Sequence, residues 1–258
     1  MEILVCVKRV PQTGGRINLA PDGRSIDTAY LGFTVSPHEE CAVEEAVRIV
    51  EAQGGSSAVL TLGPAAAEDQ LRDAMAIGID RAILLETDGA DWDPIATAGA
   101  IVEAIQAQEA AAGRPFDLIL VGNEAADTGD FQVGVRVAVA LGRPVIGGIK
   151  SLSVADGRAA ARREAPGGGW ETYELELPAV IAVKEGINLP RYPSVPGRLR
   201  ARKREIERLT PTRREAGPIM ERLRLPTEER GAVEVLGRGP EAAAPVVDLL
   251  ERIGLVGR

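Results

Sequence analysis

The chain has 258 residues, 45% of them hydrophobic and 26% charged, which is ordinary for a globular protein, and its formal net charge is −8. No stretch approaches the ~20 apolar residues of a membrane span, and the N-terminus enters an apolar run at once without a signal or transit peptide pattern. Cys6 and Cys41 are too few for a disulfide scaffold and lack metal-ligand spacing, so we expect a cytoplasmic protein that does not insert into membranes.

Strands and helices are predicted to alternate along the first half of the chain. Runs rich in Val, Ile and Leu predict buried strands, and apolar residues repeating every three to four positions predict helices. This alternation is typical of a parallel sheet covered by helices on both faces. The predicted strands are 3–10, 57–63, 81–87 and 116–122, and the predicted helices are 36–55, 64–80 and 93–108.

The first predicted helix has the strongest end signals. Ser36 is its expected N-cap, Pro37 fits the first helical position, and Glu39 completes a capping box. We expect Glu44 and Arg48 to form an i,i+4 ion pair on the face that points away from the sheet. The expected apolar stripe of this helix consists of Val43, Ala46, Val47 and Val50.

The pattern changes near residue 150. Two turn signals and the alternating "TYELELP" predict an antiparallel meander over 150–184, as an extension of an α/β domain that spans 1–184. Segment 185–214 is basic: from residue 191 onward it carries nine basic and two acidic residues, a balance of +7 that leaves −15 for the rest. Residues 185–258 are interpreted as an arm that packs on something else, and its last part, 215–258, has too little apolar content to fold alone and is expected to pack on a partner subunit.

One glycine-rich loop carries the main functional question. The stretch "GNEAADTGDFQVG", 122–134, follows a predicted strand, and in open α/β sheets ligands bind beyond the carboxyl ends of the strands. A metal site would need Glu124, Asp127 and Asp130 to converge, but their spacing is not that of a calcium loop. A phosphate cradle would use backbone N–H groups at a helix start, with glycines allowing close approach and Gln132 adding a donor. Composition alone supports a cradle and a plain solvated loop equally.

The residues that follow this loop leave a second alternative open. Valine alternates with other residues over 133–139, which is strand periodicity. If this stretch is a strand, the argument for phosphate binding at a helix N-terminus fails.

Four segments, in this order, are similar to those of the β subunit of electron-transfer flavoproteins. The resemblance covers nearly the whole chain to about residue 210, and beyond that point only the presence of an arm is shared. The segments are "VKRVP" at 7–11, "SPHEECAVEEAVR" at 36–48, "GNEAADTGDFQVG" at 122–134 and "LPAVIAVKEGINLPRYPSVPGRLRARKREIE" at 177–207.

The resemblance implies a Rossmann-like α/β fold that binds AMP as a structural ligand and makes 133–139 a helix. It also implies an α partner subunit that holds most of the FAD contacts and passes electrons from flavin dehydrogenases, such as the acyl-CoA dehydrogenases of fatty acid oxidation, to a quinone oxidoreductase. Carried over by motif, the nucleotide contacts are Cys6, Ser36, Pro37, His38, Glu39, Leu62, Asp127, Thr128, Gly129, Asp130, Phe131, Gln132, Val133, Gly134, Val135, Arg136, Val137 and Ala138.

The resemblance further implies a recognition loop for dehydrogenases at the start of the basic segment. Val195 takes the place of an apolar anchor, where relatives carry leucine, and prolines would hold the loop extended. A solvated charged face is the alternative, and nucleic acid is disfavoured because only Tyr192 offers stacking. The expected recognition residues are Arg191, Tyr192, Pro193, Ser194, Val195, Pro196, Gly197, Arg198, Leu199 and Arg200.

Two competing functions remain at this stage. In a flavin-bifurcating relative a second FAD occupies the AMP site, but such relatives often read "DGDTAQVG" where this chain reads "DTGDFQVG". An ATP-binding stress protein would need triphosphate loops that are absent here. No catalytic constellation is visible, since there is one histidine and the cysteines are distant, so we expect an electron carrier subunit and not an enzyme by itself. For His38, the alternative is an exposed residue without a function. Both cysteines are expected to be small core residues. The segment "PQTGGRIN" lacks the aromatic residue that relatives place near the flavin, so direct flavin contact by this segment is not expected.

Overall fold

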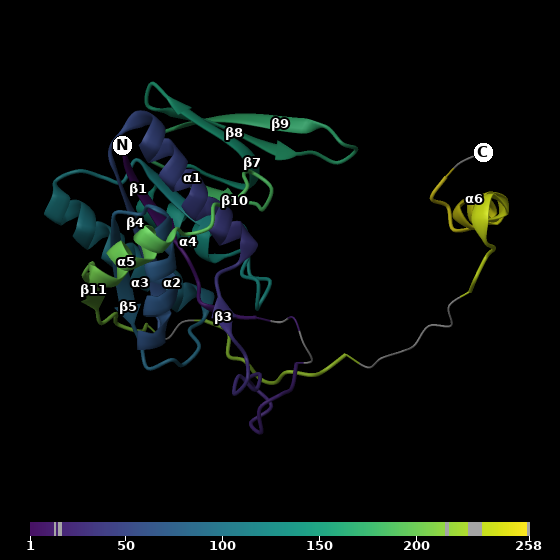
Figure 1. Cartoon of the computed structure of the whole chain (residues 1–258), viewed down its shortest axis with the longest axis horizontal. Helices are drawn as coiled ribbons and strands as arrows, with labels where there is room; N and C mark the ends of the chain where they lie inside the picture. The colour runs from purple at the N-terminus through teal and green to yellow at the C-terminus, as the bar shows by residue number, and fades with distance from the viewer. Residues whose placement is uncertain (13, 15–16, 215–216, 227–233, 257–258) are drawn as a thin grey trace.

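The computed structural model describes the whole chain except residues 13, 15–16, 215–216, 227–233 and 257–258 (Figure 1). Within the described residues, a sheet of nine strands has the order β11-β5-β4-β1-β6-β10-β7-β8-β9. Neighbouring strands are parallel from β11 to β7, and β8 and β9 are antiparallel additions at one edge. The predicted Rossmann-like α/β class is therefore confirmed.

The strands of this sheet are short at its centre and longer in the antiparallel extension. Their bounds are β1 Glu2–Cys6, β4 Ser56–Gly63, β5 Arg81–Glu86, β6 Leu118–Gly122, β7 Val145–Ala155, β8 Arg158–Glu164, β9 Trp170–Glu176, β10 Ala179–Val183 and β11 Ile206–Leu209, with β2 Val10–Pro11 and β3 Phe33–Thr34 as a separate pair. The helices are α1 Pro37–Gln53, α2 Glu68–Ile77, α3 Pro94–Ala112, α4 Val133–Leu141, α5 Val195–Lys203 and α6 Ala243–Arg252, with short 3₁₀ turns η1 Ala65–Ala67 and η2 Gly239–Ala242.

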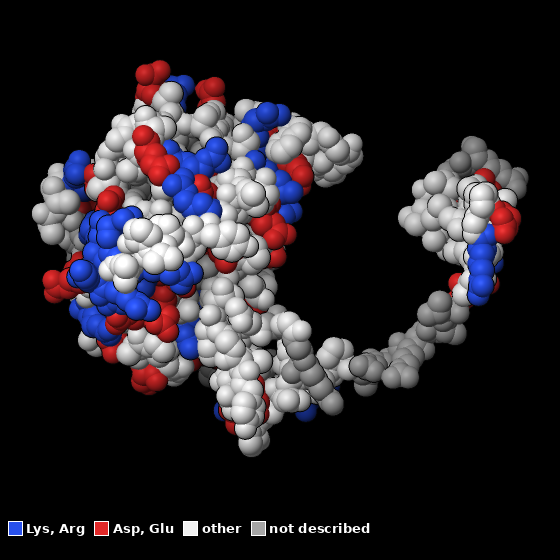
Figure 2. Space-filling model, in the orientation of Figure 1, with Lys and Arg blue, Asp and Glu red and all other residues white. Residues whose placement is uncertain are grey.

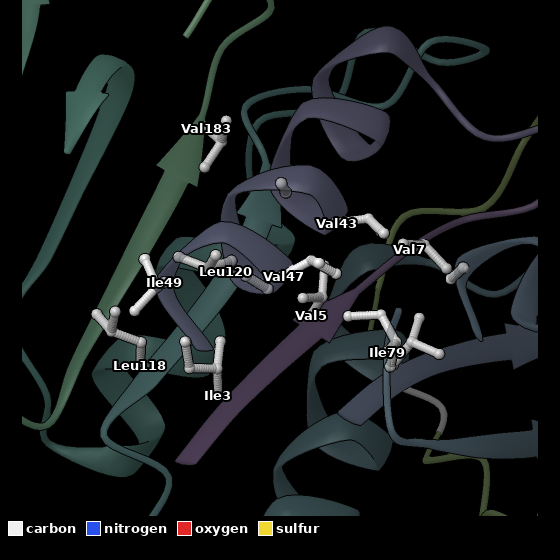
Figure 3. Close-up of a cluster of buried hydrophobic side chains, with 14 of the residues drawn as sticks. Ile3, Val5, Val7, Val43, Val47, Ile49, Ile79, Leu118, Leu120 and Val183 are labelled. Carbon is white, nitrogen blue, oxygen red and sulfur yellow. The ribbon is translucent and has the colours of Figure 1, made fainter. Parts of the chain in front are cut away.

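Two apolar cores lie on opposite faces of the sheet. Because successive strand residues point to opposite faces, Ile3 and Val5 of β1 face α1 and α2, whereas Leu4 and Cys6 face α3 and α4. Figure 3 shows the first of these cores, with residues of α1 lying over β1 and β6. Fully burying one such Ile, Leu or Val side chain stabilises the fold by about 1.5–3 kcal/mol, so the two cores hold the helices firmly against the sheet.

Helix α1 begins as the sequence predicts. Ser36 accepts a hydrogen bond from the Glu39 N–H, and the Glu39 carboxylate accepts one from the Ser36 N–H, so the predicted capping box is confirmed. The predicted Glu44–Arg48 ion pair is wrong: Arg48 pairs with Glu45, and Glu44 is buried against a segment far along the chain. Local spacing cannot reveal a partner that tertiary folding brings in.

The valine-rich stretch after the loop forms helix α4. Val137 and Ala138 are buried in the core of this face, and Val133 and Leu141 pack at its margin, which is helical spacing. The alternative of a strand is excluded. Val135 and Val139 are exposed, so two of the four alternating valines lie outside the apolar core.

The boundaries predicted for the second half of the chain differ from the structure. Strand β10 was expected to belong to the antiparallel meander, but it inserts between β6 and β7 in the parallel part. Its five residues are all buried, which is typical of a central parallel strand. The first predicted strand also ends early, at Cys6, because Lys8 and Arg9 leave the sheet.

Residues 185–209 pack on the same body and do not form a free arm. Helix α5 lies against α2, and β11 pairs with β5 at the sheet edge. Gly197 permits this approach, because a Cβ there would lie 2.3 Å from the backbone oxygen of Ala76. Beyond residue 234, helix α6 lies apart from the body in Figure 1 and exposes apolar side chains such as Val246 and Val247.

Candidate functional site

A cavity of about 1030 Å³ opens at the carboxyl ends of the central parallel strands. Its floor is formed by the ends of β1, β4 and β6, its walls by the first turns of α3 and α4, and one side by the chain after β11. A cavity at the carboxyl ends of a parallel sheet is where open α/β folds bind ligands, and its volume suits a molecule of nucleotide size.

Half of the predicted nucleotide contacts line this cavity. These are Cys6, Glu39, Leu62, Thr128, Asp130, Phe131, Val133, Gly134 and Val135. The remaining predicted contacts do not line the cavity: Ser36, Pro37, His38, Asp127, Gly129, Gln132, Arg136, Val137 and Ala138. The structure therefore brings the predicted loop and strand-end residues to one cavity.

Among the described helices, α2, α4 and α6 have no side-chain cap, but α2 and α6 directly continue the 3₁₀ turns η1 and η2, whereas α4 starts from the loop. Side-chain oxygens of Ser36, Asp93 and Ser194 cap α1, α3 and α5, whereas no side chain of the described residues caps α4. Uncapped N–H groups at a helix N-terminus attract anions, since they combine free donors with the positive end of the helix dipole. The open first turn of α4 faces the cavity and is available to a ligand.

Gly134 brings this helix start close to the sheet. A Cβ at position 134 would lie 2.7 Å from Cγ2 of Val121, which is buried in β6. No larger residue fits without moving α4 away from the strand end. The glycine is therefore required by close packing at the point where the donors face the cavity.

Glu39 and Lys8 connect the start of α1, the chain after β1 and the loop at Asp127. Besides its capping bond, the Glu39 carboxylate accepts a hydrogen bond of 2.7 Å from the N–H of Lys8, and the Lys8 ammonium pairs at 2.7 Å with Asp127 of the loop. Burial raises the pKa of Glu39 to about 7, although the hydrogen bonds from Ser36 and Lys8 oppose the shift. Burial, and then the nearby Glu39, raise the pKa of Cys6 to about 12, so this thiol stays protonated as a core residue does.

The raised pKa of Glu39 predicts a pH dependence of stability. The folded state retains a proton that the unfolded chain releases above its ordinary pKa of 4.5, so this contribution is full below pH 4.5 and is lost as the pH rises through about 7. We expect the free energy of unfolding in urea to fall by up to about 3 kcal/mol over this window and Glu39→Gln to flatten the fall. Equal pH slopes in the two proteins would contradict the assignment.

His38 is buried, so the alternative of an exposed residue is wrong. Its Nδ1 lies 2.8 Å from the backbone nitrogen of Glu185, and its Nε2 lies 3.4 Å from a carboxylate oxygen of Glu124. Cys6 and Cys41 are buried free thiols, as predicted. The described residues contain no group of three or more His, Cys, Asp or Glu side chains arranged to hold a metal ion.

The structure adds cavity residues that sequence reasoning missed. Trp92 and Asp93 follow β5, and the rule that ligands meet strand ends could have found them. Arg213 lies over the Trp92 ring, 5.6 Å from its centroid, and donates to the Asp91 carbonyl oxygen. The chain after it, 217–221, also lines the cavity, and no local signal marks that stretch.

The predicted recognition residues, 191–200, lead into α5 and are at least partly exposed except for Gly197. We call residues 185–199, which include all of them but Arg200, the docking segment. Tyr192 is 96% exposed and Val195 71% exposed, with Leu189 and Leu199 nearby in sequence and also exposed. Figure 2 shows Lys and Arg side chains gathered over α5 and β11. Exposed large apolar side chains with a basic surround are compatible with a protein-binding surface.

The docking segment is fixed to α1 by polar contacts. Asn188 donates to the Cys41 carbonyl oxygen and to Glu45, and Arg191 pairs with Glu44 at 2.9 Å and with Glu51 at 2.7 Å. These ion pairs raise the pKa of Arg191 further above its ordinary value. The exposed apolar residues are therefore presented from an ordered backbone.

In the described part of the chain, no helix has the length and apolar content needed to cross a membrane. The family model of the electron transfer flavoprotein domain matches residues 25–213. The chain is 39% identical over 207 residues to the electron transfer flavoprotein subunit beta of Syntrophomonas wolfei, an alignment covering 80% of this chain and 78% of that protein. It is 33% identical over 260 residues to the protein of the same name from Bacillus subtilis, covering 97% of each. The chain therefore belongs to the electron transfer flavoprotein β-subunit family.

Proposed function

We propose that the chain is the β subunit of a heterodimeric electron-transfer flavoprotein that carries AMP as a structural ligand. The family supports a role in electron transfer and association with a flavin and an α subunit. The observation that carries the nucleotide assignment is the uncapped start of α4 at the wall of the cavity, where Gly134 packs against β6.

The polar groups of the cavity fit a nucleoside monophosphate with the phosphate at α4. The N–H groups of the first turn of α4 would bind the phosphate oxygens. Carboxylates of Glu124 and Asp130 also line the cavity, and they suit ribose hydroxyl groups, which can donate to them. The apolar lining from Leu60, Leu62 and Val121 at the strand ends suits the adenine ring.

FAD is then held mainly by the α subunit, and this chain supplies partner recognition. This subunit would work in the cytoplasm, and electrons would pass from flavin dehydrogenases, such as acyl-CoA dehydrogenases, to the flavin and on to a membrane quinone oxidoreductase. The docking segment, with Val195 as its apolar anchor, supports this proposal because it is exposed while its backbone is fixed to α1. The exposed apolar face of α6 supports packing of the C-terminal arm, 215–258, on the α subunit, although 215–216, 227–233 and 257–258 lie outside the described residues.

The amount of bound nucleotide tests the proposal directly. The chain is co-expressed with its α subunit, the complex is purified and denatured, and the released adenine nucleotides and flavin are counted. We expect one AMP and one FAD per heterodimer. Two FAD and no AMP would replace the proposal by a bifurcating function, and ATP hydrolysis by the purified chain would favour the ATP-binding class.

A further inference from the structure

His38 lies between two surfaces that the proposed function uses separately. It occupies the first turn of α1 and is buried, with one ring nitrogen toward the loop that walls the cavity and the other toward the docking segment. Glu124 lines the cavity, and Glu185 is the first residue of the docking segment. No second histidine occurs in the chain.

The hydrogen bonds fix the chemical form of the ring. A backbone N–H can only donate, so the nitrogen that faces Glu185 at 2.8 Å must be an acceptor without a proton. The neutral ring therefore carries its hydrogen on Nε2, and this N–H points toward the Glu124 carboxylate, 3.4 Å away. Each nitrogen serves one surface, and neither can take over the other's role.

The contacts beyond the ring are continuous on both sides. On the cavity side, Asn123 precedes Glu124 and ties the loop to β7, because its side-chain oxygen accepts the Gly148 N–H at 2.6 Å. On the docking side, Asn188 and Arg191 follow Glu185 and hold the segment to α1. The Asn123 N–H also donates to the Val183 carbonyl oxygen at 2.9 Å, so the His38 ring is the side-chain link, beside this backbone link, between the loop at Glu124 and the docking segment.

We propose that His38 is a positioning residue that couples occupancy of the nucleotide cavity to the order of the docking segment. This inference rests on the proposed function, which makes the cavity a nucleotide site and residues 185–199 a docking surface. A ligand that orders Glu124 fixes the orientation of the His38 ring, and the ring in turn fixes the backbone at Glu185 through the hydrogen bond to Nδ1. By thermodynamic linkage, ordering of the docking segment strengthens nucleotide binding by the same factor.

The form of the ring is the first test. Nitrogen-15 NMR of the heterodimer gives one imidazole signal set from this chain when only this chain is labelled, because it has one histidine. We expect the Nε2–H tautomer with Nδ1 as acceptor. The Nδ1–H tautomer would overturn the proposal whether or not a nucleotide binds.

The coupling is measured by hydrogen exchange of residues 185–199 in the heterodimer with and without AMP. We expect AMP to slow exchange in this segment about fivefold in the wild type, the lower end of typical couplings, and not to slow it in His38→Ala. His38→Asn places an acceptor near Nδ1 but cannot reach Glu124, and His38→Gln reaches Glu124 but not Glu185. Each should keep one contact and lose the coupling; equal AMP protection in wild type and all three variants would overturn the proposal.

Calorimetry with AMP separates failure of this proposal from failure of the proposed function. If AMP does not bind to the heterodimer emptied of nucleotide, the proposed function fails. The coupling is then read with Glu124→Ala, which should speed exchange at 185–191 in the wild-type background and have no effect in the His38→Ala background. An equal effect of Glu124→Ala in both backgrounds would overturn the role of His38.

Discussion

Arg191→Ala is expected to lower the free energy of unfolding by about 2–3 kcal/mol and to slow electron transfer from a dehydrogenase. Glu44 is only 4% exposed, and the guanidinium of Arg191 is its charge partner. Removing one member of a buried ion pair leaves the other charge buried without compensation, which costs about 3–5 kcal/mol in full burial. The Arg191 side chain is 38% exposed, so we expect a smaller loss.

The same substitution loosens the docking segment, because the Arg191 side chain also pairs with Glu51 and only the backbone N–H bond to Glu44 remains in the variant. Urea unfolding measures the stability, and the rate of flavin reduction by a purified dehydrogenase measures the docking. Arg158→Ala is the matched control: this arginine is 59% exposed and pairs across β8 and β9 at 3.5 Å or more. Its loss should change stability by less than about 0.5 kcal/mol and leave the rate unchanged. Equal effects of the two substitutions would contradict the role of Arg191.

Gly134→Ala is expected to destabilise the fold by about 1–3 kcal/mol and to weaken AMP binding at least about tenfold. The added methyl group would meet Val121 in the buried strand β6, so the first turn of α4 must move away from the cavity wall. Displaced N–H donors no longer converge on a phosphate group. Calorimetry with AMP and urea unfolding of the purified heterodimer measure the two effects.

Gly99→Ala is the matched control, because it makes the same glycine-to-alanine change in a helix but is expected to stabilise the fold. Gly99 lies within α3, and a Cβ there meets nothing within 4 Å. Alanine in a helix interior is more stable than glycine by about 0.5–1 kcal/mol, so this variant should gain stability and bind AMP as the wild type does. If Gly134→Ala also gains stability and binds AMP normally, close packing at α4 does not shape the site.

The sequence predicted the features that depend on nearby residues. The cap of α1 requires only Ser36, Pro37 and Glu39, which are consecutive or nearly so, and the structure has it as predicted. The position of the cavity follows from a general rule about strand ends, and the strands were located from their apolar runs. Family resemblance, not periodicity, identified α4 as a helix.

Features that depend on distant residues were missed. Glu44 looked like a surface residue because its partner Arg191 lies 147 positions away. The burial of His38 requires Glu185 from the other half of the chain, and the cavity wall at Arg213 comes from beyond the last strand. Neither spacing nor composition contains this information, since it arises only when the sheet is assembled.

The insertion of β10 between β6 and β7 determines when this sheet can be completed. A chain made from its N-terminus can pair β1, β4, β5 and β6 early, but β6 and β7 have no direct contact through which to join. Residues 179–183 must emerge before the two parts of the sheet connect, and residues 206–209 before β5 is covered. Pairings of such long sequence separation form slowly and leave strand edges open meanwhile. During synthesis, the unfinished protein is therefore a half-sheet with exposed edges, and it needs protection from aggregation until most of the chain has left the ribosome.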